Sequence, residues 1–498
     1  MQHPPQDGDG NLALVGLCDS PSCGFVPVFA MLALGRSVEG EPAMAAFLAL
    51  GKTSLLGHSA SQQGSWGKDG IPDLRLARRV GFLQHLSRSS AMRIGVMLRG
   101  VDKKGGSGIY AQNLVPELLR QGSDVEWVLI YSNASQLGSS ELPSRGEEVV
   151  VPSVHPVSWD QLAVPRFARR RHVDLLFHTK FTVPLRGDVP AVMALHGGSW
   201  YVEPSFYPWW DNLYIRTMMP LYCRRAIHMI SNSECTTEDY VNLIGADRRK
   251  ISTVPLAAAP CFRPIIDAAE LARVRRRYHL PDEYILSVSV LDVRKNVPRL
   301  LRAFHLARRS HPCHLVLVGA DRSAVAARFP EIAELLDDHV ICTGWVPQHD
   351  LPAIYSMARI FFFPSIYEEF GIPNCEALAC GTPILTANRA GPPEIVGDAG
   401  LLVDPLDVEA MRAGLVRLLE DEPLRQDLSR RALLRSRLYT WRETGRRTLE
   451  VLRAVAGRAG KMRVDGQAPT GAGEAALVAS LTSSAVWSVR SPTRCPSM

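Results

Sequence analysis

The sequence predicts an α/β protein built on parallel sheets, and three observations support this fold class. From Met92 to about Ala456, short apolar runs alternate with longer amphipathic segments, as in strands joined by crossover helices. Within that series, residues 360–363 form an all-apolar run that is typical of a strand buried on both faces. At 498 residues, the chain is also long enough for two domains of ordinary size plus additional segments.

The composition is that of a globular protein. Apolar residues make up 46% of the chain and charged residues 21%. The net charge of +6 is mild for this length; it suits an anionic ligand or a brief contact with an acidic membrane surface and favours neither. The ten cysteines are scattered, without a Cys-x-x-Cys pair or a metal-ligand spacing with histidine. We therefore expect a reduced, cytoplasmic compartment.

Residues 1–91 differ from the rest of the chain. Their start lacks the basic region of a secretory signal, and their longest apolar run, residues 24–34, is too short to span a bilayer. No helical or strand periodicity persists in this part. We expect these residues to be a disordered extension, with the functional chain beginning at Met92. A misassigned start of the coding sequence would explain such an extension. A flexible regulatory or anchoring segment is the alternative.

Residues 92–260 are expected to form the first domain. A strand at 93–98 is followed by a glycine-rich loop at 100–108 and a helix at 109–120. Such a turn between the first strand and the first helix can cradle phosphate, although flexible surface loops have the same composition. The glycines concerned are Gly105, Gly106 and Gly108. Further strands are expected at 125–131, 148–151, 175–177, 191–195 and 227–230.

The strand at 191–195 leads into His196 and two glycines. A histidine at the end of a buried strand lies at the open edge of the sheet, where it can exchange a hydrogen bond with a sugar hydroxyl. A hydrogen-bonded structural histidine is the alternative. The aromatic-rich segment 200–214, with Trp209 and Trp210, can form a wall for a sugar acceptor or pack as a lid.

The second domain is expected at residues 261–440, after a proline-rich linker at 255–264. Its first strand, at 284–290, leads into a loop that contains Arg294 and Lys295. Two cations at the carboxyl end of a strand can neutralise a diphosphate, and a solvated basic turn is the alternative. Two more strands are expected at 315–318 and 340–342; the second leads into Gly344, Trp345 and Val346.

The strand at 360–363 is followed by a loop and then a helix, and two carboxylates lie along this stretch. Glu368 is expected on the loop and Glu376 in the first turn of the helix, with seven residues between them. The N–H groups of Phe370, Gly371 and Ile372 precede the helix N-terminus, where phosphate binds readily. Carboxylates accept sugar and ribose hydroxyls, so the predicted ligand carries hydroxyls and phosphate. The alternative is a helix-capping acid beside a solvated acid.

This stretch resembles the signature of the retaining glycosyltransferases of family 4. The resemblance rests on the two acids, on residues 370–373 between them, and on the Ala-Cys-Gly-Thr-Pro that ends at Pro383; it extends from about Met92 to Ala456 and includes residues 388–405. Two departures stand out. Family members usually have glycine where this chain has Glu369. They also have glycine at the position of Ser289, and some have arginine at the position of Val290.

The resemblance implies the GT-B fold: two Rossmann-like, doubly wound parallel-sheet domains that face each other across a cleft. It also implies a helix at 441–456 that crosses back to the first domain, and we expect residues 457–498 to be a disordered tail. The implied catalytic residues are His196 and Glu368. The implied donor-binding residues are Gly105, Gly106, Gly108, Arg294, Lys295, Gly344, Trp345, Val346, Glu368, Phe370, Gly371, Ile372 and Glu376.

The implied activity is retaining transfer of a hexose, of mannose or glucose type, from a nucleotide-diphosphate sugar to a glycan or lipid-linked acceptor in polysaccharide or cell-envelope biosynthesis. Peripheral contact with the cytoplasmic face of the inner membrane is a further expectation. We expect no cofactor and no metal, because the cations can replace one and no Asp-x-Asp motif is placed to bind it.

Other functions are weighed against this one. A nucleotide-sugar epimerase and a non-catalytic nucleotide-sugar-binding protein are the alternatives. The short arginine clusters at 169–171 and 275–277 lack interleaved aromatic residues, so they do not predict nucleic-acid binding. A hydride-transfer enzyme is disfavoured because no Gly-x-Gly-x-x-Gly follows a strand with an acid about twenty residues later.

Overall fold

The computed structural model describes residues 91–102, 105–138, 146–288 and 291–465, with side chains to residue 458. The description that follows concerns these residues alone. The expectations for residues 1–90, for the tail beyond residue 465 and for Ser289 and Val290 therefore lie outside the described residues.

The first domain contains a seven-stranded parallel sheet in the order β3-β2-β1-β4-β5-β6-β7. The order reverses between β1 and β4, which is the switch point where ligands bind in doubly wound sheets. The strands are β1 (Met92–Met97), β2 (Val125–Tyr131), β3 (Gly146–Val150), β4 (Leu175–His178), β5 (Ala191–Leu195), β6 (His228–Ser231) and β7 (Ile251–Thr253). Only β7 has no counterpart in the sequence prediction.

Both faces of this sheet are covered, as its apolar strands require. Successive residues of β1 point to opposite faces, so Val96 joins one buried cluster and Met97 another. The covering helices include α4 (Gly106–Gln121), α6 (Val164–Arg170), α8 (Trp209–Arg225) and α9 (Glu234–Ile244). Shorter elements are η1 (Ala134–Gln136), α5 (Pro156–Ser158), η2 (Trp159–Ala163), α7 (Ser199–Val202), η3 (Pro204–Phe206) and η4 (Arg248–Lys250).

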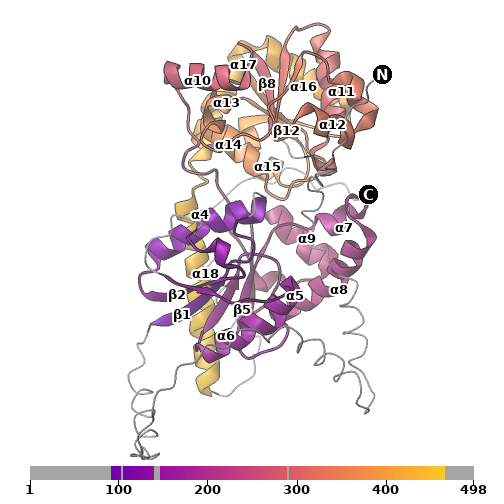
Figure 1. The fold of residues 1–498 in the computed structure, drawn as a ribbon. Coiled ribbons are helices and arrows are strands. Elements are labelled where there is room, and N and C mark those ends of the chain that lie inside the picture. The colour runs from indigo at the N-terminus through magenta and orange to yellow at the C-terminus, as the bar shows by residue number, and fades with distance from the viewer. Residues whose placement is uncertain (1–90, 103–104, 139–145, 289–290, 466–498) are drawn as a thin grey trace, which may run out of the picture. The chain divides into compact units, whose positions relative to one another are not determined.

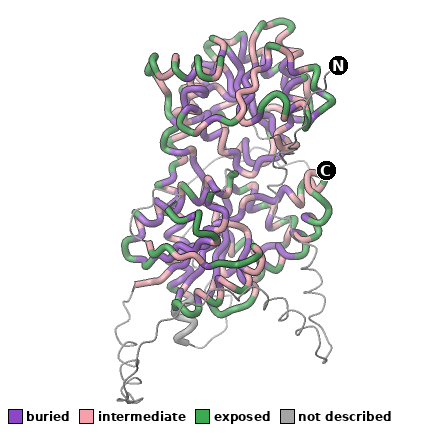
Figure 2. The backbone as a smooth tube through the Cα atoms, viewed as in Figure 1, coloured by how far each residue is buried: buried purple, intermediate pink, exposed green. Residues whose placement is uncertain are grey.

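The second domain contains a six-stranded parallel sheet in the order β10-β9-β8-β11-β12-β13, which reverses between β8 and β11. The strands are β8 (Tyr284–Val288), β9 (His314–Val318), β10 (Val340–Cys342), β11 (Ile360–Phe363), β12 (Ile384–Ala387) and β13 (Gly400–Val403). All four residues of β11 are buried; Phe361 and Phe363 pack on one face and Ile360 and Phe362 on the other. The prediction of a strand buried on both faces is confirmed. Figure 2 shows this buried interior in purple.

Helices surround the second sheet, and the last one returns to the first domain. They are α10 (Ala268–Tyr278), η5 (Val293–Lys295), α11 (Val297–Arg308), α12 (Arg322–Arg328), η6 (Pro330–Leu335), α13 (Leu351–Met357), α14 (Ile372–Cys380), α15 (Pro392–Val396), η7 (Gly397–Ala399), α16 (Val408–Glu420), α17 (Glu422–Ser436) and α18 (Trp441–Asp465). Helix α18 packs along α4 (Figure 1), and Arg453 pairs with Asp124. The implied crossing helix is confirmed, and it continues past the expected end at residue 456.

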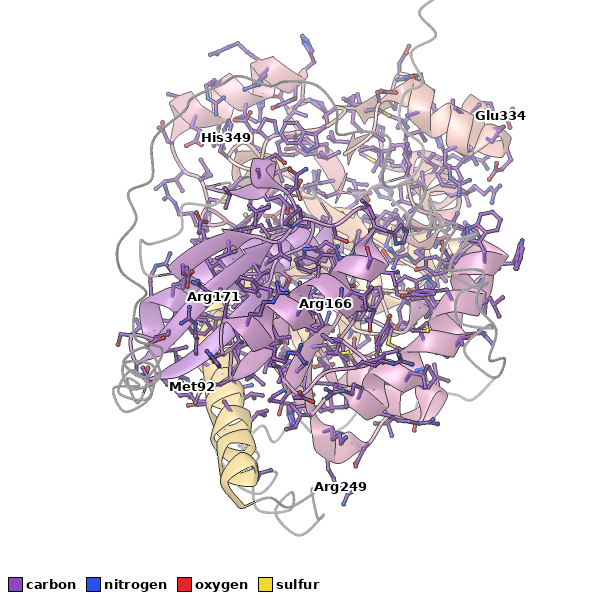
Figure 3. All side chains as sticks on the ribbon, turned by 60° about the horizontal axis from the view of Figure 1, so that its bottom comes forward. Met92, Arg166, Arg171, Arg249, Glu334 and His349 are labelled. Atoms are coloured by element: carbon purple, nitrogen blue, oxygen red, sulfur yellow. The ribbon has the colours of Figure 1, made fainter. Side chains whose placement is uncertain are left out.

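Two observations concern the surface. Arg171, at the end of α6, is labelled in Figure 3 and forms an exposed ion pair with Glu147, as expected of a solvated basic cluster. None of the helices in the described part of the chain is both long enough and apolar enough to cross a membrane.

Candidate functional site

The candidate site lies where β8 and β11, the two strands at the second switch point, end. The loop after β8 carries Arg294 and Lys295, and the loop after β11 carries the acids. The N–H of Ile366 donates to the carbonyl of Arg294 at 2.8 Å. The buried Asn296 side chain donates to the carbonyl of Pro364 at 3.0 Å and to that of Pro405 at 2.6 Å. These hydrogen bonds hold the two loops together.

Lys295 and Glu368 form a largely buried ion pair. Their side chains are 11% and 8% exposed, respectively. The Lys295 ammonium also lies 4.9 Å from the centroid of the Phe363 ring, the last residue of β11. The sequence prediction placed both residues at the donor, and the structure brings them into direct contact.

Arg294 is held by two other carboxylates. Its Nε and Nη2 donate to Oδ2 of Asp292 at 3.0 and 2.7 Å, and its Nη1 donates to Oε1 of Glu369 at 3.3 Å. Burial by itself raises the pKa of Asp292, but the hydrogen bond and charge of Arg294 outweigh it and hold that pKa below its usual value. The sequence analysis missed Asp292 as a site residue, although its place two residues before Arg294 was a usable signal.

The helix α14 begins at this loop. Gly371 precedes it with φ of +82°, and a Cβ at that position would meet Nδ2 of Asn374 at 2.9 Å. Within the described residues, both polar atoms of the Asn374 side chain and Oγ of Ser365 are buried without a hydrogen-bond partner. Orphaned buried polar atoms call for an explanation, and a polar ligand in front of the helix N-terminus supplies one.

Glu376 is the fifth residue of α14, so it lies just past the first turn of the helix, in which it was expected. Its Oε2 accepts a hydrogen bond from the Tyr355 hydroxyl at 2.8 Å. Burial raises the pKa of Glu376 to about 7, and the bond from Tyr355 opposes that shift. The position excludes Glu376 as a helix-capping acid. Tyr355 on α13 was missed, because nothing in the sequence signals a partner that is distant along the chain.

On the first domain, His196 follows β5 directly. Its Nε2 lies 2.6 Å from the carbonyl oxygen of Thr179. A carbonyl only accepts, so Nε2 carries the proton and Nδ1 is an acceptor. Burial lowers the pKa of His196 to about 4, so the ring is neutral at physiological pH. The Tyr110 ring of α4 packs against it edge to face, with centroids 5.0 Å apart.

The strand end that carries His196 touches the loop of the acids. A Cβ on Gly197 would lie 1.8 Å from Cγ of Glu369, so the Glu369 side chain rests directly on that glycine. The Ser233 hydroxyl, at the N-terminus of α9, donates to the Glu369 carbonyl at 2.6 Å. The Glu394 carboxylate accepts from the N–H of Glu234 at 3.0 Å. The structure therefore brings His196 and the acidic loop to one place.

The remaining predicted residues lie elsewhere at the sheet edges. Gly105 precedes α4, and Gly106 and Gly108 lie inside its first turn, so the expected loop is shorter than predicted. Gly344 has φ of +68° and follows β10; its carbonyl accepts from the N–H of Gly319 at 2.9 Å. Trp345 is 60% exposed, whereas Val346 is buried. Contacts of these residues with donor phosphate or base remain predictions.

The described residues contain no group of three or more His, Cys, Asp or Glu side chains arranged to hold a metal ion. Metal independence itself remains a prediction.

Two family models match the chain, one for each domain. The model described as "Glycosyltransferase Family 4" matches residues 104–258. The model described as "Glycosyl transferases group 1" matches residues 272–435, which include the cation loop and both motif acids.

Curated relatives include several glycosyltransferases. O-antigen chain mannosyltransferase B of Escherichia coli is 29% identical over 295 residues, which are 58% of this chain and 77% of the relative. D-inositol 3-phosphate glycosyltransferase of Acidothermus cellulolyticus is 32% identical over 243 residues, 46% of this chain and 53% of the relative. The serotype-specific mannosyltransferase WbdA of E. coli is 30% identical over 232 residues, and only 28% of its length is covered.

Solved structures share the fold at low identity. Sucrose-phosphate synthase from Thermosynechococcus elongatus has a TM-score of 0.60 and 20% identity, covering 74% of this chain and 100% of the other. A glycosyltransferase from Rickettsia africae has a TM-score of 0.58 and 15% identity, covering 74% and 99%. Anabaena HepE, crystallised with UDP and glucose, has a TM-score of 0.58 and 17% identity, covering 73% and 100%.

Proposed function

The chain belongs to the glycosyltransferases of group 1 and family 4 and has their GT-B fold, and we propose that it transfers a hexose from a nucleotide-diphosphate sugar to a glycan acceptor with retention of anomeric configuration. One observation carries the proposal. Both cations and the first motif acid converge on the ends of β8 and β11, in front of α14. Ligands bind at such switch points in parallel sheets.

The donor's diphosphate would bind to Arg294, Lys295 and the N–H groups at the start of α14. Negative charge grows on the diphosphate as it leaves the sugar. Fixed cations and a helix N-terminus aimed at that charge stabilise the transition state more than the ground state. The unpartnered side chains of Ser365 on the loop and Asn374 in the first turn of α14 would supply further polar contacts.

The hydroxyl groups of the donor would bind to three other residues. Glu368 would accept from the sugar and Glu376 from the ribose, in its ionised form. His196, neutral and with Nδ1 as acceptor, would accept from a hydroxyl of the sugar on the first-domain side. Since Glu376 has a pKa of about 7 without donor, ribose binding would favour its ionised form and draw that pKa down.

We propose a mannose-type donor and a glycan or lipid-linked acceptor in polysaccharide biosynthesis. This narrower assignment is supported by the mannosyltransferases of E. coli among the relatives, one of which is named for the O-antigen chain. Glucose-type transfer is the second choice, because sucrose-phosphate synthase of Zea mays, 31% identical over 194 residues, is also a relative.

Contact with the cytoplasmic face of a membrane belongs to the same proposal. Helix α8, labelled in Figure 1, exposes Trp209 by 71%, Trp210 by 47% and Leu213 by 45%. Arg216 and Arg224 are exposed on the same helix. Aromatic and basic side chains together favour an anionic lipid surface. Sedimentation with vesicles of phosphatidylglycerol should therefore weaken after Trp209→Ser with Trp210→Ser; equal sedimentation of both proteins would contradict it.

The test of the activity is a panel of nucleotide sugars. A bound donor stabilises the native state by mass action, so the true donor should raise Tm while its competitors do not. Transfer is then measured with that donor and extracted glycan acceptors, and the anomeric configuration of the product is read by NMR. Arg171→Ala, on the far exposed cluster, serves as the control variant.

The panel also separates the alternatives. An isomerised sugar formed without acceptor would select an epimerase, and binding without transfer would select a non-catalytic protein. Inversion at the anomeric carbon would contradict the retaining mechanism. Full activity in excess EDTA is expected, because Arg294 and Lys295 would neutralise the diphosphate in place of a metal ion. A strict requirement for added metal would contradict this.

A further inference from the structure

Glu369 adds a carboxylate where family members usually have glycine. This glutamate is not a mobile side chain on the protein surface. The Glu369 side chain is 14% exposed, and it lies against Gly197, whose φ of +124° and missing Cβ leave the space it fills. Its carbonyl is held by Ser233 and lies 2.4 Å from where a Cβ on Gly391 would be. The structure therefore fixes this carboxylate beside the proposed diphosphate site.

The charges at the site do not balance for an anionic ligand. Arg294 and Lys295 supply two positive charges, and Asp292, Glu368 and Glu369 supply three negative ones, which leaves one excess negative charge. With glycine at position 369 the sum would be zero. A diphosphate that enters this cluster meets a like charge in a partly buried place, where such repulsion is costly.

Resting on the function proposed above, we infer that Glu369 sets the donor affinity of the site: its carboxylate occupies Arg294 until the donor's diphosphate displaces it, and it takes up one proton from solvent as it is displaced. Arg294 keeps its contact with Asp292, so the guanidinium stays in place while one of its partners changes. Glu369 thus lowers donor affinity and makes it depend on pH.

The surroundings of Glu369 support the proton uptake. Burial raises the pKa of Glu369, the Arg294 charge lowers it, and Glu368 raises it. When the Glu369 carboxylate loses its contact with Arg294 and a phosphate arrives beside it, burial and nearby negative charge act on it together. Both favour the protonated form of Glu369. The other titratable and charged groups that face Glu369 are Lys295 on the cation loop, Tyr207 after η3, Tyr367 on its own loop, and Cys235 and Tyr240 on α9. Behind them lie Glu238, Asp239 and Glu394, which interact with Cys235.

Asp239 is the one rival for the proton among these groups, because burial raises its pKa to about 6. It accepts a hydrogen bond from the Tyr367 hydroxyl, and that bond opposes the shift. The rival is tested by Asp239→Asn, which removes its titration and leaves Glu369 unchanged.

The test is calorimetric titration of the full chain with UDP, GDP and inorganic pyrophosphate, in buffers of different ionisation enthalpy. The native protein should take up protons when it binds pyrophosphate at pH 7.5, and fewer when it binds UDP or GDP, because their ribose would favour loss of the Glu376 proton. Glu369→Gly and Glu369→Gln should abolish that uptake and bind the same probe at least fivefold tighter at pH 8, with a smaller gain at pH 5.5. Asp239→Asn should keep the uptake. Use of both Glu369 variants guards against one that fails to fold.

The outcomes separate this inference from the function it rests on. If Lys295→Ala and Arg294→Ala weaken binding while both Glu369 variants match the native protein in affinity and proton uptake, the inference is wrong and the site stands. Uptake lost only in Asp239→Asn would also overturn it. If the Lys295 and Arg294 variants bind as tightly as the native protein, or if none of the probes binds, the diphosphate site itself is overturned.

Discussion

The loop after β5 in the first sheet and the loop after β11 in the second meet where Gly197 faces Glu369, yet their chemistry differs. The loop after β11, with its neighbour after β8, gathers three carboxylates and two cations in three ion pairs. The loop after β5 offers a neutral histidine, two glycines and Ser199, whose Oγ lies 2.6 Å from the Tyr207 hydroxyl. We therefore expect the second domain to recognise charge and the first to contribute neutral hydrogen bonds.

This difference predicts that changes in the two loops fail in different ways. Loss of a charge in the second domain should weaken the binding of nucleoside diphosphates, since the diphosphate is their common charged part. Loss of the histidine should reduce transfer while nucleotide binding persists, because the sugar is absent from that probe.

The largest effect is expected for Lys295→Ala. Removing one preorganised group that stabilises developing charge typically costs about 2.7–4 kcal/mol, so kcat should fall roughly 100-fold or more. UDP or GDP affinity should fall as well, whereas His196→Asn should change nucleotide affinity less than twofold. Steady-state kinetics and calorimetry measure both. Because Lys295→Ala leaves Glu368 buried without its partner, thermal unfolding must show that the variant is folded.

Similar behaviour of Lys295→Ala and His196→Asn would contradict the proposed difference between the two loops. Equal loss of nucleotide affinity in both would show that His196 contacts the diphosphate side. Unchanged kinetics in Lys295→Ala would show that the positive charge of Lys295 does not stabilise the leaving diphosphate.

A smaller effect is expected for Glu376, and it concerns stability. Burial raises its pKa from 4.5 to about 7, so between these values the folded state binds more protons than the unfolded chain. Stability is therefore fully present below about pH 4.5 and is lost as the pH rises through 7. Glu376→Gln removes this penalty, which amounts to about 2 kcal/mol between pH 5.5 and 8.

Denaturant unfolding at the two pH values measures this change. The variant should gain stability over the native protein at pH 8 and much less at pH 5.5, while donor turnover falls at least tenfold because the amide accepts ribose hydroxyls poorly. A gain of the same size at both pH values would mean that packing, not ionisation, is responsible.

Local chemistry explains which parts were predictable. The strand at Ile360–Phe363 is readable because four apolar residues in a row can only be satisfied by burial on both faces. The pairing of Lys295 with Glu368 could only be seen in the fold, since the two lie 73 positions apart in the chain. The sequence marked Glu369 as a departure, but not its contact with Gly197, because close approach between distant segments leaves no periodic trace. Tyr355 beneath Glu376 was hidden for the same reason.

The smallest effect expected is that of Gly197→Ala, and it tests whether the two loops must touch. The new Cβ would overlap Cγ of Glu369, from which the ideal position is only 1.8 Å away. At φ of +124° an alanine is also strained. Displacement of the loop by the added methyl should lower turnover about tenfold, since small misplacements of reacting groups are costly.

The matched variant separates the clash from the backbone strain. Adding Glu369→Gly to Gly197→Ala removes the side chain that the methyl meets but leaves the strained backbone. Recovery of most of the turnover in the double variant would show that the contact between the loop after β5 and the loop after β11 limits the reaction. Without recovery, the loss comes from the backbone at Gly197 alone, and the two loops act independently. Turnover in the double variant above that of the native protein would agree with Glu369 as a brake on donor binding, because both its bulk and its charge are then gone.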